Sequence, residues 1–150
     1  MSVANNGTAH AAAIAALATL LLTASAQAAP VGLSGAWFRA LPAGLPAAGY
    51  FTLHNGGGRM IALTGADSPA CGMLMLHKSE NMGGMEHMVA VDRIDVAPGA
   101  TVVFAPGGYH LMCMDPKPAL RPGARVPATL QFSDGTRLQV WFAVRGAAGN

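Results

Sequence analysis

The sequence is poor in charged residues. Lys, Arg, Asp and Glu make up 11% of the 150 residues, and none of them occurs before Arg39. The nine basic and seven acidic side chains give a formal net charge of +2 and form no cluster of one sign. A basic stripe is the usual mark of a protein that binds nucleic acid or an anionic membrane surface. The sequence therefore indicates neither partner.

The sequence also lacks an apolar run long enough to span a bilayer. The longest, AAAIAALATLLLTA at 11–24, has fourteen residues, whereas a transmembrane helix needs about 20. The run fits the hydrophobic region of a secretory signal, and the small residues of ASAQAAP follow it as at a cleavage site. We predict a signal peptide over 1–28 and an exported mature chain, 29–150, without stable membrane insertion. The run has no preceding Lys or Arg, and a buried N-terminal helix is the alternative.

Cysteine is scarce, since Cys71 and Cys113 are the only two. In an exported protein an even pair most simply forms a disulfide. The alternative is that Cys113, which lies among methionines, is a free thiol able to bind a metal. The spacing of the cysteines does not decide between the two, so both alternatives stay open.

Helical periodicity is absent beyond the predicted signal. Gly and Pro recur about every ten residues, and eight short segments of strand composition lie between them. These segments are 49–55, 60–65, 71–79, 87–91, 101–106, 109–114, 125–132 and 137–144. Asp134-Gly135 is expected to form the hairpin turn between the last two. The pattern predicts one all-β domain, a sandwich or a barrel.

Methionine, in contrast, is abundant and clustered. Seven of the eight methionines beyond the predicted signal lie between Met73 and Met114, as do three of the four histidines. Thioether sulfur is a soft, neutral ligand and imidazole a borderline one. Together they suit Cu(I) better than Mg²⁺ or Ca²⁺, which prefer oxygen ligands.

Four residues are the main candidates for such a site. His110 and Met112 are alternate residues of one expected strand, so they share a face and can reach one ion. His77 ends another expected strand, and a loop would return Met88 towards it. Secondary candidates, for which a plain surface role is the alternative, are Met82, Met85 and His87. Met73 and Met75 are expected to pack in the core.

The spacing of the four main candidates resembles a known family. His77, ten residues, Met88, twenty-one residues and then His110-x-Met112 match the H-x10-M-x21-H-x-M pattern of the periplasmic copper chaperones called PCu(A)C. The segments AAGYFTLHN, GGYHLM and RPGARVPATLQFSDG are also similar to that family. The resemblance covers roughly residues 36–144.

The resemblance implies a fold, a site and a function. The fold would be a cupredoxin-like antiparallel Greek-key barrel or sandwich. One Cu(I) per monomer would be bound by His77, Met88, His110 and Met112. The protein would be a periplasmic metallochaperone and not an enzyme, delivering copper by ligand exchange to an acceptor such as the CuA subunit of cytochrome c oxidase.

Two other functions remain open at this point. A periplasmic copper buffer or resistance protein would use the same site without a dedicated recipient. An electron-transfer cupredoxin would need a His₂Cys set with a weak axial Met. Here Cys113 follows both His110 and Met112, whereas the cysteine generally comes first in cupredoxin loops. The order of the residues therefore favours a copper carrier.

Overall fold

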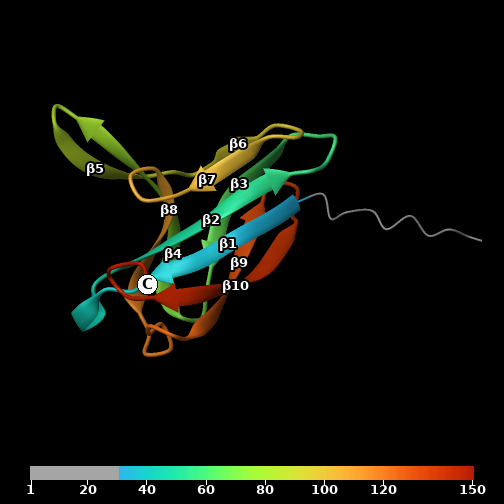
Figure 1. Cartoon of the computed structure of the whole chain (residues 1–150). Helices are drawn as coiled ribbons and strands as arrows, with labels where there is room; N and C mark the ends of the chain where they lie inside the picture. The colour runs from blue at the N-terminus through green and yellow to red at the C-terminus, as the bar shows by residue number, and fades with distance from the viewer. Residues whose placement is uncertain (1–30) are drawn as a thin grey trace, which may run out of the picture.

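A computed structural model describes residues 31–150 as a single ten-stranded sheet (Figure 1). The strands are β1 Val31–Arg39, β2 Ala47–Asn55, β3 Ile61–Asp67, β4 Cys71–Met82, β5 Met85–Ala90, β6 Ile94–Val96, β7 Thr101–Phe104, β8 Tyr109–Pro116, β9 Arg125–Phe132 and β10 Arg137–Arg145. Helical structure in this range is limited to a 3-10 turn at Pro42–Gly44. None of it is long and apolar enough to cross a bilayer. The predicted signal peptide, 1–28, lies outside the described residues.

The expected all-β fold is confirmed, with two strands more than the sequence pattern suggested. β1 escaped notice because a register shift between Ser34 and Trp37, with Gly35 at φ +63°, breaks its alternation. β6 has only three residues, too few for a pattern to show. The hairpin turn at Asp134-Gly135 forms as expected, with the Thr136 amide donating to Asp134 Oδ1 over 2.8 Å.

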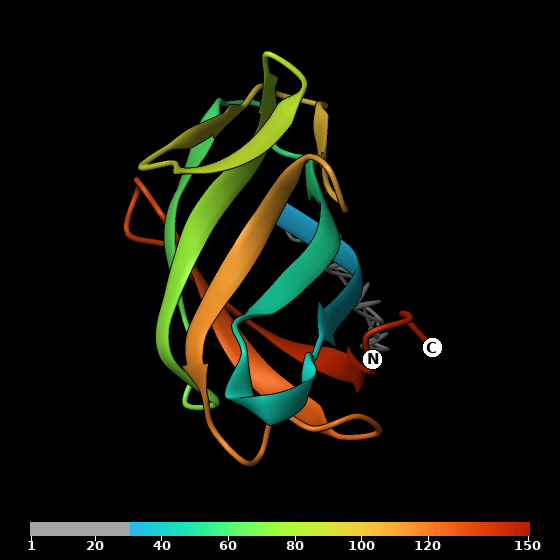
Figure 2. The same ribbon diagram turned by 90° about the vertical axis from the view of Figure 1, so that its left-hand side faces the viewer.

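The order of strands across the sheet is β5-β4-β8-β7-β2-β1-β10-β9-β3-β6, and β8 also pairs with β2. The sheet coils until β3 packs against β4, which gives the barrel-like sandwich seen in Figure 2. Most neighbours are antiparallel, as expected, but β1 pairs with β10 and β7 with β8 in parallel. The strands β5, β4 and β8 therefore lie side by side at one end of the order.

The core lies between the two layers of the coiled sheet. The Phe38 and Phe142 rings lie 4.8 Å apart, and Phe51 stacks on Phe104 at 4.1 Å. Alternate residues of β9 are buried in the same core. Burial of these aromatic and aliphatic side chains is the main stabilising contribution to the fold.

The pairing of β4 with β8 separates an inner face from an outer face. Leu76 lies opposite Leu111 and Leu74 opposite Cys113, and all four are buried. The intervening residues must then face outward. Met73 is accordingly 57% exposed, and Met75 is only half-buried. The expectation that these two methionines pack in the core was wrong, because the leucines between them occupy the inner face.

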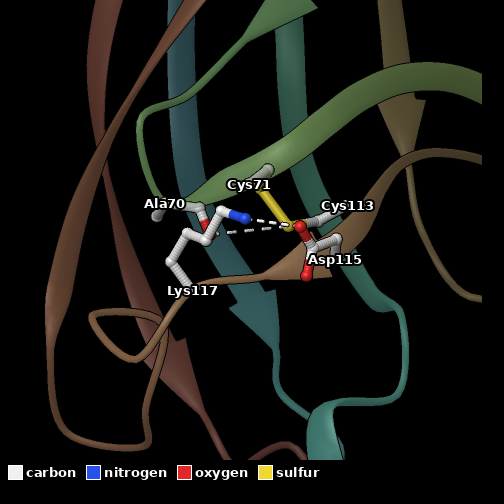
Figure 3. A network of polar contacts seen from close by, with 5 residues as sticks. All are labelled: Ala70, Cys71, Cys113, Asp115 and Lys117. Atoms are coloured by element: carbon white, nitrogen blue, oxygen red, sulfur yellow. Dashed lines mark hydrogen bonds and ion pairs between the residues drawn. A yellow bond between two sulfur atoms is a disulfide. The ribbon is translucent and has the colours of Figure 1, made fainter.

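Cys71 and Cys113 form a disulfide, with their Cα atoms 5.4 Å apart (Figure 3). Residues 31–150 contain no free cysteine, so the alternative of a metal-binding thiol at Cys113 is wrong. In a regular ladder these residues would not face each other, but β8 departs from extended geometry at Asp115, where φ is +50°. Gly72 lies so close that a Cβ there would be 2.7 Å from Asp115 Oδ2. The ladder between β4 and β8 is therefore irregular next to both cysteines.

Removing the disulfide should destabilise the fold without changing it. The two cysteines are 42 residues apart, and closing a loop of that size in the unfolded chain contributes about 4 kcal/mol in the chain-entropy model. For the double variant Cys71→Ala, Cys113→Ala we expect a loss of about 2–4 kcal/mol in the free energy of unfolding, measured by urea denaturation.

A reducing agent supplies the control for this experiment. It should lower the urea midpoint of the parent protein to that of the double variant and leave the variant unchanged. A parent midpoint that is insensitive to complete reduction would show that the cross-link does not stabilise the protein.

Candidate metal centre

The hairpin formed by β4 and β5 projects beyond the rest of the sheet (Figure 1). Gly83 and Gly84 form its two-residue turn with φ of +64° and +84°, a conformation that non-glycine residues rarely adopt. Asn81 Oδ1 accepts a hydrogen bond from the Gly84 amide over 3.1 Å. The expected loop before Met88 is thus this two-residue turn, and the strand expected at 87–91 is β5, which begins at Met85.

The hairpin sets the face on which Met88 lies. Met88 pairs with Ser79 and Ala90 pairs with His77. Directly opposite residues of an antiparallel pair share a face, and so do alternate residues of one strand. Met88 is therefore on the same face as His77, displaced from it by two residues towards the turn. Its side chain is 58% exposed.

The pairing of β4 with β8 brings the other two candidates to this face. His110 lies directly opposite His77, and Met112 lies opposite Met75. The four main candidates thus share the outer face of three neighbouring strands. Met75 is a further thioether on this face that sequence reasoning assigned to the core. Met114 also shares it but lies one pair further from the histidines, opposite Met73.

The two histidine rings are neighbours in an edge-to-face arrangement, and each has a nitrogen without a hydrogen-bond partner. Their centroids are 5.8 Å apart and their planes are inclined at 80°. His110 Nδ1 lies 3.1 Å from the Gly108 carbonyl oxygen, which can only accept, so Nδ1 donates and Nε2 keeps its lone pair. His110 Nε2 and His77 Nδ1 are buried without a hydrogen-bond partner. Buried nitrogens without partners on two neighbouring imidazoles fit the nitrogen ligands of a metal ion.

The Gly108 carbonyl is a feature that sequence reasoning missed. It fixes the tautomer and the orientation of His110, which is only 3% exposed. The GGY motif before His110 carried the signal, since a turn two residues before a histidine can place a carbonyl against its ring. The same carbonyl accepts from the Ser79 amide over 3.1 Å, so it also links β8 to β4 beside His77.

The electrostatics of the site favour neutral ligands. Burial lowers the pKa of His77 below its ordinary value of 6.5, and the neighbouring His110 lowers it further. An imidazole must be neutral to bind a metal, so this shift keeps His77 ready for binding in mild acid. Residues 31–150 contain no group of three or more His, Cys, Asp and Glu side chains able to hold an ion. The side chains beside the two histidines on this face are thioethers, which with imidazole suit a soft ion such as Cu(I).

The secondary candidates are separated from this site. Met85 and His87 alternate with Glu86 and Met88 along β5, so they point to the opposite face of the hairpin. Met82 pairs directly with Met85 and shares that opposite face. The structure therefore does not bring these three residues to the two histidines.

Comparison with known proteins gives a family and a fold. The profile of the LpqE-like family, described as "Putative lipoprotein LpqE-like", matches residues 31–144. The protein named "Putative lipoprotein Lxx21020" of Leifsonia xyli subsp. xyli is 36% identical over 128 residues, which are 85% of this chain and 76% of that protein.

Solved structures of similar fold include two copper-related domains. The Cu(I) form of DR1885 from Deinococcus radiodurans is 35% identical, with a TM-score of 0.64 over 81% of this chain and 83% of that one. The apo PCuAC domain of PmoF2 is 23% identical, with a TM-score of 0.66 over 79% of this chain and 92% of that one. The cupredoxin-like architecture expected from the sequence is thereby confirmed.

The lowered pKa of His77 can be measured by an NMR pH titration. We expect His77 to titrate below 6.5 in the metal-free protein, and the variant His110→Gln to raise its pKa only part of the way back, because burial remains. The neutral form is favoured by folding, so this contribution to stability is present above pH 6.5 and is lost as the pH falls through the lowered pKa.

His54→Gln is the matched control for this titration. His54 lies on β2 and contacts Thr101 Oγ1 at 3.0 Å, so its removal should leave the pKa of His77 unchanged. A His77 pKa at or above the ordinary value in the parent protein would contradict the desolvated geometry of the pair.

Proposed function

The chain belongs to the LpqE-like family, and from that premise we propose that it is an exported Cu(I) carrier. The observation that supports this function best is the pair of buried, unpartnered nitrogens on His77 and His110. They lie on the same sheet face as Met88 and Met112, so one ion would have two imidazole and two thioether ligands. We propose one Cu(I) at this site per monomer.

The comparisons support copper as the cargo. DR1885, which is 35% identical to this chain, has been solved with Cu(I) bound. The proposed ligands include no carboxylate and no thiolate. Affinity alone would not single out one metal for such a site, but Cu(I) prefers soft, neutral ligands of this kind. The chemistry of the side chains on this face therefore agrees with the Cu(I) in the DR1885 structure.

The difference in burial among the four ligands suggests how the ion would leave. His110 is 3% exposed and is oriented by Gly108, whereas Met88 is 58% exposed on the projecting hairpin. An acceptor thiolate would form a Cu–S bond as the bond to Met88 breaks, and the ion would stay Cu(I) throughout. The histidines would be the last ligands displaced. Because all four are neutral, the site holds the ion without a counter-charge that would oppose release.

We propose that the recipient is a protein with cysteine ligands, the CuA centre of cytochrome c oxidase being the foremost candidate. The predicted signal peptide over 1–28 supports export, and we propose the periplasm as the compartment. The protein makes and breaks coordination bonds only, so its role would be that of a carrier and not of an enzyme.

Thioether ligation predicts a specific loss of affinity. Met88→Leu and Met112→Leu should each weaken Cu(I) binding by about 10- to 100-fold, because leucine keeps the volume of the side chain but has no donor atom. Competition against a chromophoric Cu(I) chelator measures this effect.

Met60→Leu is the control for these variants, because Met60 is about as exposed as Met88 but lies outside β4, β5 and β8. It should bind Cu(I) like the parent. Parent-like binding by both the Met88 and the Met112 variants would exclude the proposed ligand set.

Delivery can be separated from storage by a transfer assay. We expect the Cu(I)-loaded protein to pass its ion to an apo CuA domain. With the same amount of Cu(II) supplied to every mixture, the transfer is seen as the absorption of the assembled CuA centre. The Met60→Leu protein should deliver equally well. Retention of Cu(I) in the presence of excess acceptor would instead favour a copper buffer.

A further inference from the structure

The face of the β4–β5 hairpin that points away from the two histidines carries its own group of soft donors. Met82 and Met85 are directly opposite each other at the end of the hairpin. His87 follows Met85 by two residues on β5 and so shares its face. All three are exposed, Met82 by 54% and Met85 by 65%.

The register brings the three donors within reach of one ion. The Cβ atoms of directly opposite residues lie about 4.5–5.5 Å apart, which sets the spacing of Met82 and Met85. Alternate residues of one strand are about 6.6 Å apart, which sets the spacing of Met85 and His87. A methionine side chain has three rotatable bonds. Two thioethers and an imidazole can therefore converge without movement of the backbone.

Packing does not account for these methionines. Neither belongs to the hydrophobic core or to the side chains packed against it. A Cβ atom added to Gly83 or Gly84, in the turn between them, would have no neighbouring atom within 4 Å. No described element therefore covers this turn. Polar or β-branched residues serve better at exposed hairpin positions. The two thioethers thus lie open to solvent beside a histidine.

We propose that Met82, Met85 and His87 form a second site for Cu(I). Two sulfurs and one nitrogen make a neutral three-ligand set suited to a soft monovalent ion. Glu80 lies directly opposite His87 on the same face and pairs with Lys78 Nζ at 3.2 Å, so the local charge near the ion is balanced. This second site shares no residue with the site of His77 and does not depend on it.

The sites differ in how they are built, which predicts different affinities. The nitrogens of His77 and His110 are buried and held in place, whereas every donor of the hairpin site is exposed and must be ordered by the ion. The hairpin site should therefore bind Cu(I) more weakly. The hairpin site would bind its ion after the site of His77 and His110 is occupied, and it would release its ion first.

Cu(I) stoichiometry tests the second site. Titration of the chain over residues 29–150 against a chromophoric Cu(I) chelator should show two equivalents, the second the weaker. The triple variant Met82→Leu, Met85→Leu, His87→Gln should lose the second equivalent only. The variant Met88→Leu, Met112→Leu should lose the first and keep the hairpin equivalent, so failure of either site is seen separately. One equivalent in the parent, or two in the triple variant, would overturn the proposal.

A second measurement locates the ion. Ag(I) is a redox-inert substitute for Cu(I), and its addition can be followed through the methyl signals of methionine in NMR spectra. Beyond the first equivalent, the Met82 and Met85 signals should shift while that of Met60 does not. Shifts confined to Met73 and Met114 would instead place the second ion on the outer face of β4 and β8 and would refute the hairpin site.

Discussion

The register between β4 and β8 is the constraint on which the candidate site depends. It sets His77 opposite His110 and Leu76 opposite Leu111. A slip of one residue would turn every side chain of a strand to the other face, removing leucines from the core and one imidazole from its partner. Packing of the inner face therefore fixes the outer face. The disulfide, at the far end of the same two strands, secures that pairing covalently.

The histidine pair imposes a cost on the metal-free protein. A buried polar atom without a partner costs about 1–3 kcal/mol, and each of these two neighbouring rings has one such nitrogen. The lowered pKa of His77 favours its uncharged form, which avoids a buried charge but supplies no hydrogen bond. The surrounding sheet must provide the stability that keeps these rings in place. An ion bound between them would relieve that cost, so binding and folding of this region are coupled.

Much of this arrangement could be predicted from local sequence patterns. The strand composition of the segments between recurring Gly and Pro residues indicated an all-β fold, and the i, i+2 spacing placed His110 and Met112 on one face. The inner and outer faces of 71–79 could not be assigned, since CGMLMLH alternates two kinds of apolar residue. Only the pairing with β8 shows that the leucines face inward and the methionines outward. The sequence could not decide whether the two cysteines form a disulfide for a similar reason. The irregular backbone at Asp115 depends on tertiary structure.

The position of β5 at the end of the strand order has a further consequence. Its outer backbone edge has no strand beside it among residues 31–150, and such edges can template the pairing of separate molecules. β5 is short, and Glu86 and His87 place polar side chains along it, which opposes the stacking of one copy on another. The hairpin that carries the exposed sulfurs is thereby protected against aggregation by its own polarity.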